Sequence, residues 1–267
     1  MSAAPVLIFD SGVGGLSVVK PLRTLLPQAE LAYVADTEYY PYGTRSSAEI
    51  EARVPAMLGR LSEVLKPRLI VIACNTASTI ALEPVRAALA TPIVGTVPAI
   101  KVAARVSKSR AIGVLGTDAT IRQPYVDRLA ADFAPDCRIV RLGSAELVDI
   151  AEAKLRGVPP NREALAAILA AMTALPGGSK IDTIVLACTH FVLLRDELEA
   201  ASGRAFTFVD GSEGIARRAR FLLGGQTWSP EREGGTAWFT GPTTDLDGYR
   251  PGFAAHGFAE LKHFPGR

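Results

Sequence analysis

The segment Val71-Ile72-Ala73-Cys74-Asn75-Thr76 returns later in the chain as Val185-Leu186-Ala187-Cys188-Thr189-His190. In both copies an apolar strand ends in Ala-Cys, and a short polar turn follows. Each copy is preceded by another apolar strand, which ends in Phe9-Asp10-Ser11-Gly12 or in Leu115-Gly116-Thr117-Asp118. The repeat therefore predicts two similar units of about a hundred residues each, which is an ordinary domain size.

Short β-branched runs alternate with amphipathic stretches along most of the 267 residues. Continuous apolar strands between helices are typical of a parallel sheet that helices cover on both faces, so the sequence predicts an α/β fold. The clearest expected helices cover residues 48–65, 123–133 and 162–175. The expected strands cover residues 6–9, 31–35, 69–73, 93–94, 111–115, 139–140, 184–187 and 206–209.

The chain is expected to cross between the two units at residues 92–98 and again at residues 209–212. Residues 1–97 with 210–267 would then form the first α/β domain, and residues 98–209 the second. Ligands of open parallel sheets bind outside the carboxyl ends of the strands, and both repeated cysteines follow such ends. If the domains face each other, the two cysteines approach one cleft from opposite sides.

The composition is typical of a soluble globular protein, with 48% hydrophobic and 21% charged residues and a net charge of +2. No basic patch indicates nucleic-acid binding, and no apolar run reaches the roughly 18 residues of a membrane-spanning helix. The N-terminus lacks the pattern of a signal peptide. The three cysteines are too few for a disulfide framework, which favours a reducing compartment and hence the cytoplasm.

A glycine-rich loop, Asp10-Ser11-Gly12-Val13-Gly14-Gly15, follows the first strand and opens a helix. A dinucleotide-binding loop needs glycine at its first, third and sixth positions, and counting from Gly12 the sixth residue is Ser17. That match therefore fails, and two interpretations stay open. The loop holds an anion such as a carboxylate at the helix N-terminus, or it is a tight turn that Asp10 caps.

A lone cysteine after a buried strand is usually a small hydrophobic residue, but two cysteines at equivalent positions of a repeat favour a function. Cys137 lies outside the repeat and is expected to be structural. His190 is the only histidine near either repeated cysteine. Its spacing from Cys188 fits no zinc site, so we interpret it as an acid–base partner of that thiol.

Several weaker candidates are ordinary residues when each is taken alone. Pro41-Tyr42-Gly43 is normal turn chemistry, and Glu152 indicates an exposed acid on a helix. Thr120 either lines the cleft or starts a helix. Lys101 has no phosphate loop beside it that would indicate pyridoxal phosphate. The short polar side chains that suit a carboxylate or an amino group are Asn75, Thr76, Thr117 and Thr189.

In their order along the chain, these motifs resemble those of bacterial glutamate racemases, in the aspartate/glutamate racemase family, over roughly residues 5–220. Any one motif is weak, but the ordered set is specific. The matching stretches are Asp10-Ser-Gly-Val-Gly-Gly15, Tyr33-Val-Ala-Asp36, Pro41-Tyr-Gly43, Ala73-Cys-Asn-Thr-Ala-Ser78, Gly95-Thr-Val-Pro-Ala-Ile-Lys101, Gly116-Thr117, Ala119-Thr120 and Ala187-Cys-Thr-His190.

The resemblance implies two α/β domains with pseudo-two-fold symmetry and an active site in the cleft between them. It implies interconversion of L- and D-glutamate without pyridoxal phosphate, metal or nucleotide, and a supply of D-glutamate for peptidoglycan. By motif, Cys74 and Cys188 would be the acid–base pair, assisted by Asp10 and His190. Glu152 and Asp36 are also matched, Glu152 as a catalytic residue. The expected substrate-binding residues are Asp10, Ser11, Tyr42, Gly43, Asn75, Thr76, Thr117, Thr120, Thr189 and His190.

Two departures from the family pattern concern the shape of the cleft. Phe191-Val192 stands where the family usually has Tyr-Pro, and Gln123 stands where it often has a smaller residue. Three other functions stay open: racemisation of aspartate or a hydantoin, ligand binding by a non-catalytic relative, and thiol–disulfide exchange, which the absence of a C-x-x-C motif disfavours. A homodimer is the default expectation for assembly, and we expect no nucleic-acid or membrane partner.

Overall fold

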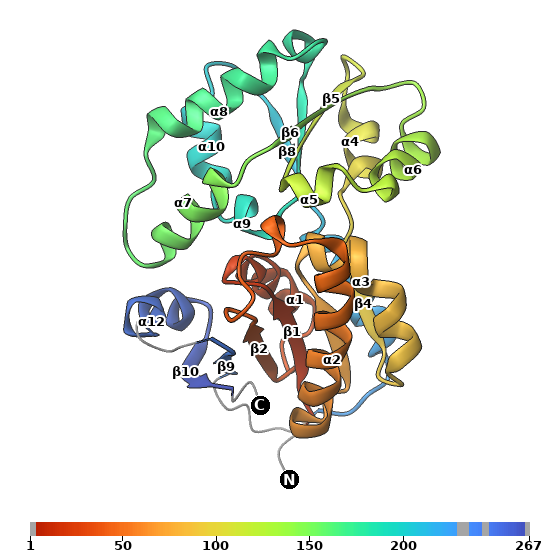
Figure 1. The fold of residues 1–267 in the computed structure, drawn as a ribbon, viewed down its shortest axis with the longest axis vertical. Coiled ribbons are helices and arrows are strands. Elements are labelled where there is room, and N and C mark those ends of the chain that lie inside the picture. The colour runs from red at the N-terminus through yellow and green to blue at the C-terminus, as the bar shows by residue number, and fades with distance from the viewer. Residues whose placement is uncertain (1–3, 229–234, 242–245, 265–267) are drawn as a thin grey trace.

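Two parallel β-sheets, each covered by helices, lie one above the other in the computed structural model (Figure 1). The structure describes residues 4–228, 235–241 and 246–264. The first sheet has the strand order β10-β9-β2-β1-β3-β4, and the second has the order β6-β5-β7-β8. We call each sheet with its helices a lobe, the first lobe holding the six-stranded sheet.

The order β2-β1-β3-β4 of the first sheet is repeated as β6-β5-β7-β8 in the second. Every strand pair in both sheets is parallel. The repeat inferred from the sequence is therefore a repeat of topology, and β9 and β10 extend the first sheet at its β2 edge. The predicted fold class, two similar parallel-sheet α/β units, is confirmed.

The central strands of the first sheet are buried on both faces because their residues are apolar, except for Asp10 at the end of the first strand. Side chains alternate along a strand, so Val6 and Ile8 enter one core while Leu7 and Phe9 enter the other. The strands of this sheet are β1 (Val6–Asp10), β2 (Leu31–Ala35), β3 (Leu69–Ile72), β4 (Ile93–Gly95), β9 (Gly235–Phe239) and β10 (Phe258–His263).

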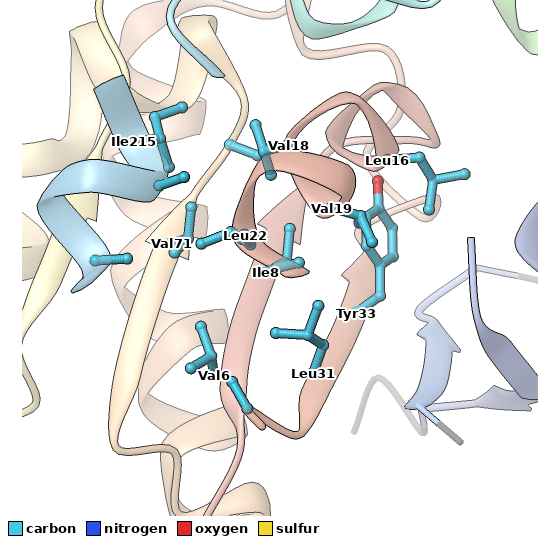
Figure 2. Close-up of a cluster of buried hydrophobic side chains, with 14 of the residues drawn as sticks. Val6, Ile8, Leu16, Val18, Val19, Leu22, Leu31, Tyr33, Val71 and Ile215 are labelled. Atoms are coloured by element: carbon cyan, nitrogen blue, oxygen red, sulfur yellow. The ribbon is translucent and has the colours of Figure 1, made fainter. Parts of the chain in front are cut away.

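Helices α1 and α11 cover one face of the first sheet, where their side chains pack onto β1, β2 and β3 (Figure 2). On the other face, α2 begins with a capping box in which Ser46 and Glu49 bond to each other's backbone N–H groups. The helices of this lobe are η1 (Gly14–Val18), α1 (Val19–Leu25), η2 (Tyr42–Thr44), α2 (Ser47–Leu65), α3 (Asn75–Ala88), α11 (Ser212–Leu222) and α12 (Leu246–Ala255).

The second lobe repeats this arrangement around a smaller sheet, with separate apolar cores on its two faces. Its strands are β5 (Ala111–Gly116), β6 (Arg138–Gly143), β7 (Thr183–Leu186) and β8 (Thr207–Val209). Its helices are α4 (Ile100–Val106), α5 (Asp118–Ile121), α6 (Pro124–Phe133), α7 (Glu146–Leu155), α8 (Arg162–Ala174), η3 (Gly178–Lys180), α9 (Thr189–Val192) and α10 (Arg195–Ala201).

The three helices expected from the sequence are present as α2, α6 and α8, with ends within one residue of the expectation. The C-terminal strands β9 and β10 and helix α12 were not anticipated. β10 has a mostly exposed pattern because it is an edge strand, so it lacks the continuous apolar run that marks the central strands. The domain limits at 97/98 and 209/210 stay a prediction. No helix among the described residues could span a membrane.

The C-terminal segment is anchored by Phe253, which is fully buried and forms edge-to-face contacts with Tyr33, Phe239 and Phe258. Phe253→Ala is expected to lower the free energy of unfolding by about 3–5 kcal/mol, because it leaves a cavity among these rings. Chemical denaturation measures the change. Phe221→Ala is the matched control, since Phe221 is 74% exposed and its loss should change stability by no more than about 0.5 kcal/mol.

Candidate active site

Both repeated cysteines follow a strand that ends at the boundary between the lobes. Ala73 N–H donates to Phe9 O at 2.8 Å, and Ala187 N–H donates to Leu115 O at 2.7 Å, so each Ala-Cys pair leaves its sheet in the same way. Cys74 then caps α3, its sulfur accepting the Ala77 N–H at 3.4 Å. Cys188 directly precedes α9.

The two thiols line one cavity of about 170 Å³ between the lobes, and each cysteine is 6% exposed. A larger cavity of about 1160 Å³ runs along the connecting segments 93–102 and 209–218 but contains neither thiol. The smaller cavity is therefore the candidate active site. It is lined by Ser11, Pro41, Tyr42, Gly43, Thr44, Cys74, Asn75, Thr76, Thr117, Asp118, Ala145, Val148, Asp149, Cys188, Thr189 and His190.

Cys74 is a thiol in a buried and partly anionic environment. Burial, together with the nearby charge of Asp10, raises its pKa from 9.0 to about 12, although the Ala77 N–H favours the thiolate. Ser11 Oγ lies 3.8 Å from the Cys74 sulfur. At neutral pH, Cys74 is therefore protonated and can donate a proton.

Asp10 is fully buried and joins the two lobes. Its Oδ1 accepts the Gly12 N–H at 2.9 Å, and its Oδ2 accepts the Thr189 hydroxyl at 3.0 Å. Burial raises its pKa from 3.8 to about 6, and the charge of His190 limits this rise. Asp10 thus closes the tight turn at Gly12 and caps no helix, because η1 begins only at Gly14.

Cys188 lies next to a hydrogen-bonded histidine–carboxylate pair. His190 Nδ1 is 3.9 Å from the Cys188 sulfur, and His190 Nε2 is 2.8 Å from Glu152 Oε1. Burial disfavours the charged forms of His190 and Glu152, but their hydrogen bonds and opposite charges outweigh the effect of burial. The pKa of His190 is raised well above its usual value, and the pKa of Glu152 is lowered. The pair is therefore charged, and it places an imidazolium beside the Cys188 sulfur.

The sequence interpretation of Glu152 as an exposed acid is wrong. Glu152 does lie on a helix, α7, but it is only 5% exposed because its side chain turns toward the first lobe. Its Oε1 also accepts the Val13 N–H at 3.0 Å, and its Oε2 accepts the Tyr249 hydroxyl at 2.9 Å. A buried carboxylate with three hydrogen-bond donors is well satisfied.

Three threonine hydroxyls from both lobes meet at one end of the cavity. Thr76, Thr117 and Thr120 form a triangle in which each Oγ1–Oγ1 distance is 3.0 Å. Thr117 also caps α5 by accepting the Thr120 N–H, whereas Thr120 is fully buried behind the lining. Asn75 Oδ1 is buried and has no hydrogen-bond partner among the described residues, so it can accept a bond from an amino group.

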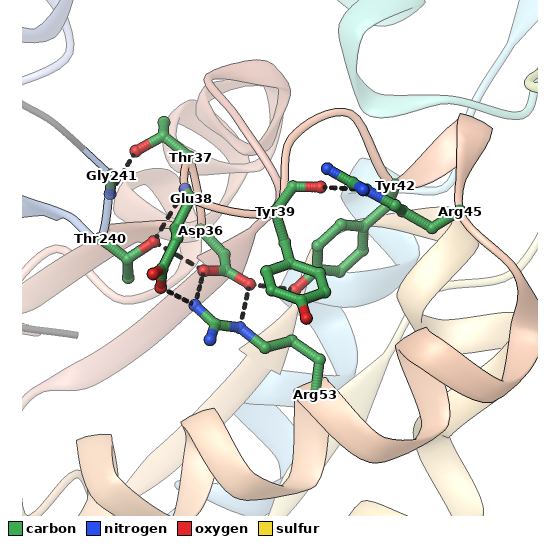
Figure 3. Close-up of polar contacts among 9 residues, drawn as sticks. All are labelled: Asp36, Thr37, Glu38, Tyr39, Tyr42, Arg45, Arg53, Thr240 and Gly241. Atoms are coloured by element: carbon green, nitrogen blue, oxygen red, sulfur yellow. Dashed lines mark hydrogen bonds and ion pairs between the residues drawn. The ribbon is translucent and has the colours of Figure 1, made fainter. Parts of the chain in front are cut away.

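The loop that carries Tyr42 and Gly43 is fixed by a polar cluster centred on Asp36 (Figure 3). The buried Asp36 carboxylate accepts from the Tyr42 hydroxyl at 2.5 Å, from two guanidinium nitrogens of Arg53 at 2.7 and 3.0 Å, and from the Thr240 hydroxyl at 2.6 Å. The Tyr42 hydroxyl thus donates its proton to Asp36 and has none left to donate to a ligand in the cavity. Asp36 itself does not line the cavity and acts through this loop.

The structure brings ten of the expected site residues into the lining and places the others just behind it. Asp10, Glu152 and Thr120 contact lining residues through hydrogen bonds. The two departures from the family pattern, at Phe191-Val192 and Gln123, lie outside the lining. Sequence reasoning missed Asp149 and Tyr249, for which no local motif gives a signal. Within the described ranges, no group of three potential ligands could hold a metal ion.

Comparisons with known proteins agree with this geometry. The sequence model of the Asp/Glu/Hydantoin racemase family matches residues 17–219. A glutamate racemase of Sphingopyxis alaskensis is 58% identical over 237 residues, which are 89% of this chain and 88% of that protein. A glutamate racemase of Salmonella enteritidis is 42% identical over 261 residues, or 97% of this chain and 92% of that one.

Among solved structures, the chain resembles Escherichia coli glutamate racemase in complex with L-glutamate and the activator UDP-MurNAc-Ala. The TM-score is 0.89 at 39% identity, and the match covers 98% of each chain. A glutamate racemase of Thermus thermophilus, solved in complex with β-chloro-D-alanine, matches with a TM-score of 0.76 at 30% identity and covers 98% of this chain and 96% of that one.

Asp10→Asn is expected to stabilise the protein at alkaline pH. Because burial holds the folded-state pKa at about 6 against 3.8, the wild type loses stability as the pH rises from about 4 to about 6. The neutral amide avoids this loss, which is of the order of 3 kcal/mol. Denaturation of both proteins at about pH 4 and about pH 8 checks this. A variant whose advantage does not grow with pH contradicts the buried charge.

Proposed function

Because the chain belongs to the Asp/Glu/Hydantoin racemase family, we propose that it interconverts L- and D-glutamate with Cys74 and Cys188 as an acid–base pair. The observation that carries this proposal is that thiols from the two lobes line one small cavity. Racemisation removes the α-proton from one face of the substrate and returns a proton to the other. Two bases on opposite sides meet this requirement without any reorientation of the substrate.

The surroundings of the two thiols give each a starting role. Cys188, beside the imidazolium of His190, takes the α-proton as a thiolate, while Cys74 gives its thiol proton to the opposite face. In the reverse direction Cys74 must act as the thiolate, and its proton passes to Asp10. A carboxyl group with a pKa of about 6 can both accept and return that proton near neutral pH.

The polar groups of the cavity suit an α-amino acid. The unpartnered Asn75 Oδ1 accepts from the substrate ammonium group, and the hydroxyls of Thr76 and Thr117 bind its carboxylates. The Thr189 hydroxyl donates to Asp10, so its oxygen is left to accept from the ammonium group. The α-proton is a weak acid, so most of the rate must come from positioning and from a preorganised polar cavity. Glutamate is the proposed substrate because the similar proteins are named glutamate racemases.

The proposal extends to the setting of the reaction. The D-glutamate formed would enter peptidoglycan synthesis and so support the cell wall and cell shape. The enzyme would act in the cytoplasm as a homodimer, without pyridoxal phosphate, metal or nucleotide. Light scattering tests the dimer, and a protein with the mass of a monomer would overturn that part of the proposal.

Proton NMR in D₂O tests the function directly. D-Glutamate is incubated with the enzyme, a chelator and no added cofactor, and L-glutamate formation is followed separately by a chiral assay. Loss of the α-proton signal together with L-glutamate formation is expected. Exchange with aspartate or a hydantoin but not with glutamate would change the substrate. No exchange with any of the three would indicate a ligand-binding protein that retains the fold.

Cys74→Ser and Cys188→Ser are each expected to lower kcat by about 100-fold or more, because a serine hydroxyl is a far weaker acid than a thiol. Steady-state kinetics in both directions measure the loss. Cys137→Ser is the matched control, since Cys137 lies outside the cavity and should keep wild-type activity. Near-normal turnover by either of the first two variants contradicts the two-thiol assignment.

A further inference from the structure

Helix α12 of the C-terminal segment reaches across to α7 of the second lobe, where its Tyr249 meets Glu152 (Figure 1). The Tyr249 hydroxyl lies 2.9 Å from Glu152 Oε2, and Arg156 Nη1 donates to the same hydroxyl oxygen at 3.1 Å. The tyrosine ring stacks on Phe239 with a centroid distance of 5.8 Å and contacts Phe253 at 6.4 Å. These contacts hold the hydroxyl in one place.

We propose that Tyr249 is a positioning residue for the His190–Glu152 pair, so that the C-terminal segment completes the acid–base group of one thiol only. This inference rests on the proposed racemase function. Tyr249 does not line the cavity, and its effect on the reaction passes through Glu152 and His190 to Cys188.

The chemistry of Glu152 and Arg156 fixes the direction of the hydrogen bond between Tyr249 and Glu152. An ionised carboxylate only accepts hydrogen bonds, and a guanidinium only donates them. Arg156 therefore occupies a lone pair of the Tyr249 oxygen, and the hydroxyl proton points to Glu152. Glu152 Oε1 already receives Val13 N–H and His190. With Oε2 held by Tyr249, the carboxylate is fixed at both oxygens and cannot rotate away from the imidazole.

The contact is one-sided. The groups around the Cys74 sulfur are Ser11, the Ala77 N–H and the charge of Asp10. The Tyr249 hydroxyl bonds instead to Glu152 and Arg156, which both lie on the side of Cys188. The titratable groups that interact electrostatically with Glu152 include His190 on α9, Tyr40 in the loop before η2, and Asp10 at the end of β1. Loss of the Tyr249 hydroxyl should thus disturb proton transfer at Cys188 directly and transfer at Cys74 far less, because only the charge of Asp10 links Glu152 to that thiol.

The asymmetry has a specific kinetic signature. Enantiomers have equal free energy, so any variant must lower kcat/KM equally in both directions. The primary isotope effect with α-deuterated substrate is free to differ. When transfer at Cys188 slows, that effect rises for the enantiomer whose α-proton Cys188 removes. The isotope effect falls for the other enantiomer. Cys74 removes the α-deuteron of that enantiomer in a rapid first step, and the slow second step is proton transfer from Cys188.

The test compares Tyr249→Phe with Tyr125→Phe, which removes a hydroxyl from α6 outside the cavity. Tyr249→Phe keeps the ring that packs on Phe239 and Phe253. It is expected to lower kcat/KM by about ten-fold, short of the loss of a whole acid–base group. Its isotope effects should move in opposite directions for L- and D-glutamate. Tyr125→Phe should match the wild type in every measurement.

Unchanged kinetics in Tyr249→Phe, or isotope effects that change equally for both enantiomers, would overturn the inference and indicate a merely structural tyrosine. If the wild type does not racemise glutamate, the proposed function fails. NMR of histidine-labelled protein then tests separately whether Tyr249 positions the His190–Glu152 pair. The buried His190 Nε2–H should give a downfield proton signal in the wild type and in Tyr125→Phe. That signal should move upfield or exchange away in Tyr249→Phe, and a signal that stays or moves downfield overturns the inference.

Discussion

The buried Glu152 carboxylate holds the lobes together at the candidate active site, and much of the local sequence follows from its position. It accepts Val13 N–H from the first lobe while it bonds His190 of its own lobe. This close approach leaves no room for side chains on the facing loop. A Cβ on Gly12 would lie 2.4 Å from Glu152 Oε1, and one on Gly14 would lie 2.5 Å from His190 Nδ1. Gly12 and Gly14 are therefore required by the packing of the two lobes against each other.

The repeated scaffold carries two chemically different thiols. Backbone hydrogen bonds place Cys74 and Cys188 equivalently at the ends of β3 and β7. Their neighbours differ, because Cys74 faces the charge of Asp10 and Cys188 faces the imidazole of His190. Similar backbones with different helpers suit a reaction whose two half-steps need one acid and one base at a time. The symmetry of the fold therefore extends to the positions of the thiols, while their polar neighbours are side chains that the repeat does not share.

The sequence predicted the parts of the structure that local patterns encode. Apolar runs marked the central strands, and the shared Ala-Cys ends placed both thiols at one edge of their sheets. Contacts between distant residues had no such signal. Val13 and Glu152 are 139 positions apart, and Asp10 and Thr189 are 179 apart, so their hydrogen bonds depend on how the lobes pack. For the same reason the local sequence around Glu152 indicates a surface acid, and no local motif marks Tyr249. The catalytic roles of the site residues stay predictions.

Within the described residues, the chain passes between the lobes at two segments, residues 96–99 between β4 and α4 and residues 210–211 between β8 and α11. Two fixed attachment points define a line, so rigid lobes can move relative to each other mainly by rotation about that line. Both thiols of the cavity are only 6% exposed, so a rotation that parts the lobes would widen the path to them. Opening breaks the bonds of Glu152 to Val13, of Thr189 to Asp10 and of Thr76 to Thr117 together. The contacts that hold the two lobes together at the candidate active site are thus made by the proposed acid–base and binding groups themselves, so parting the lobes would also disassemble that site.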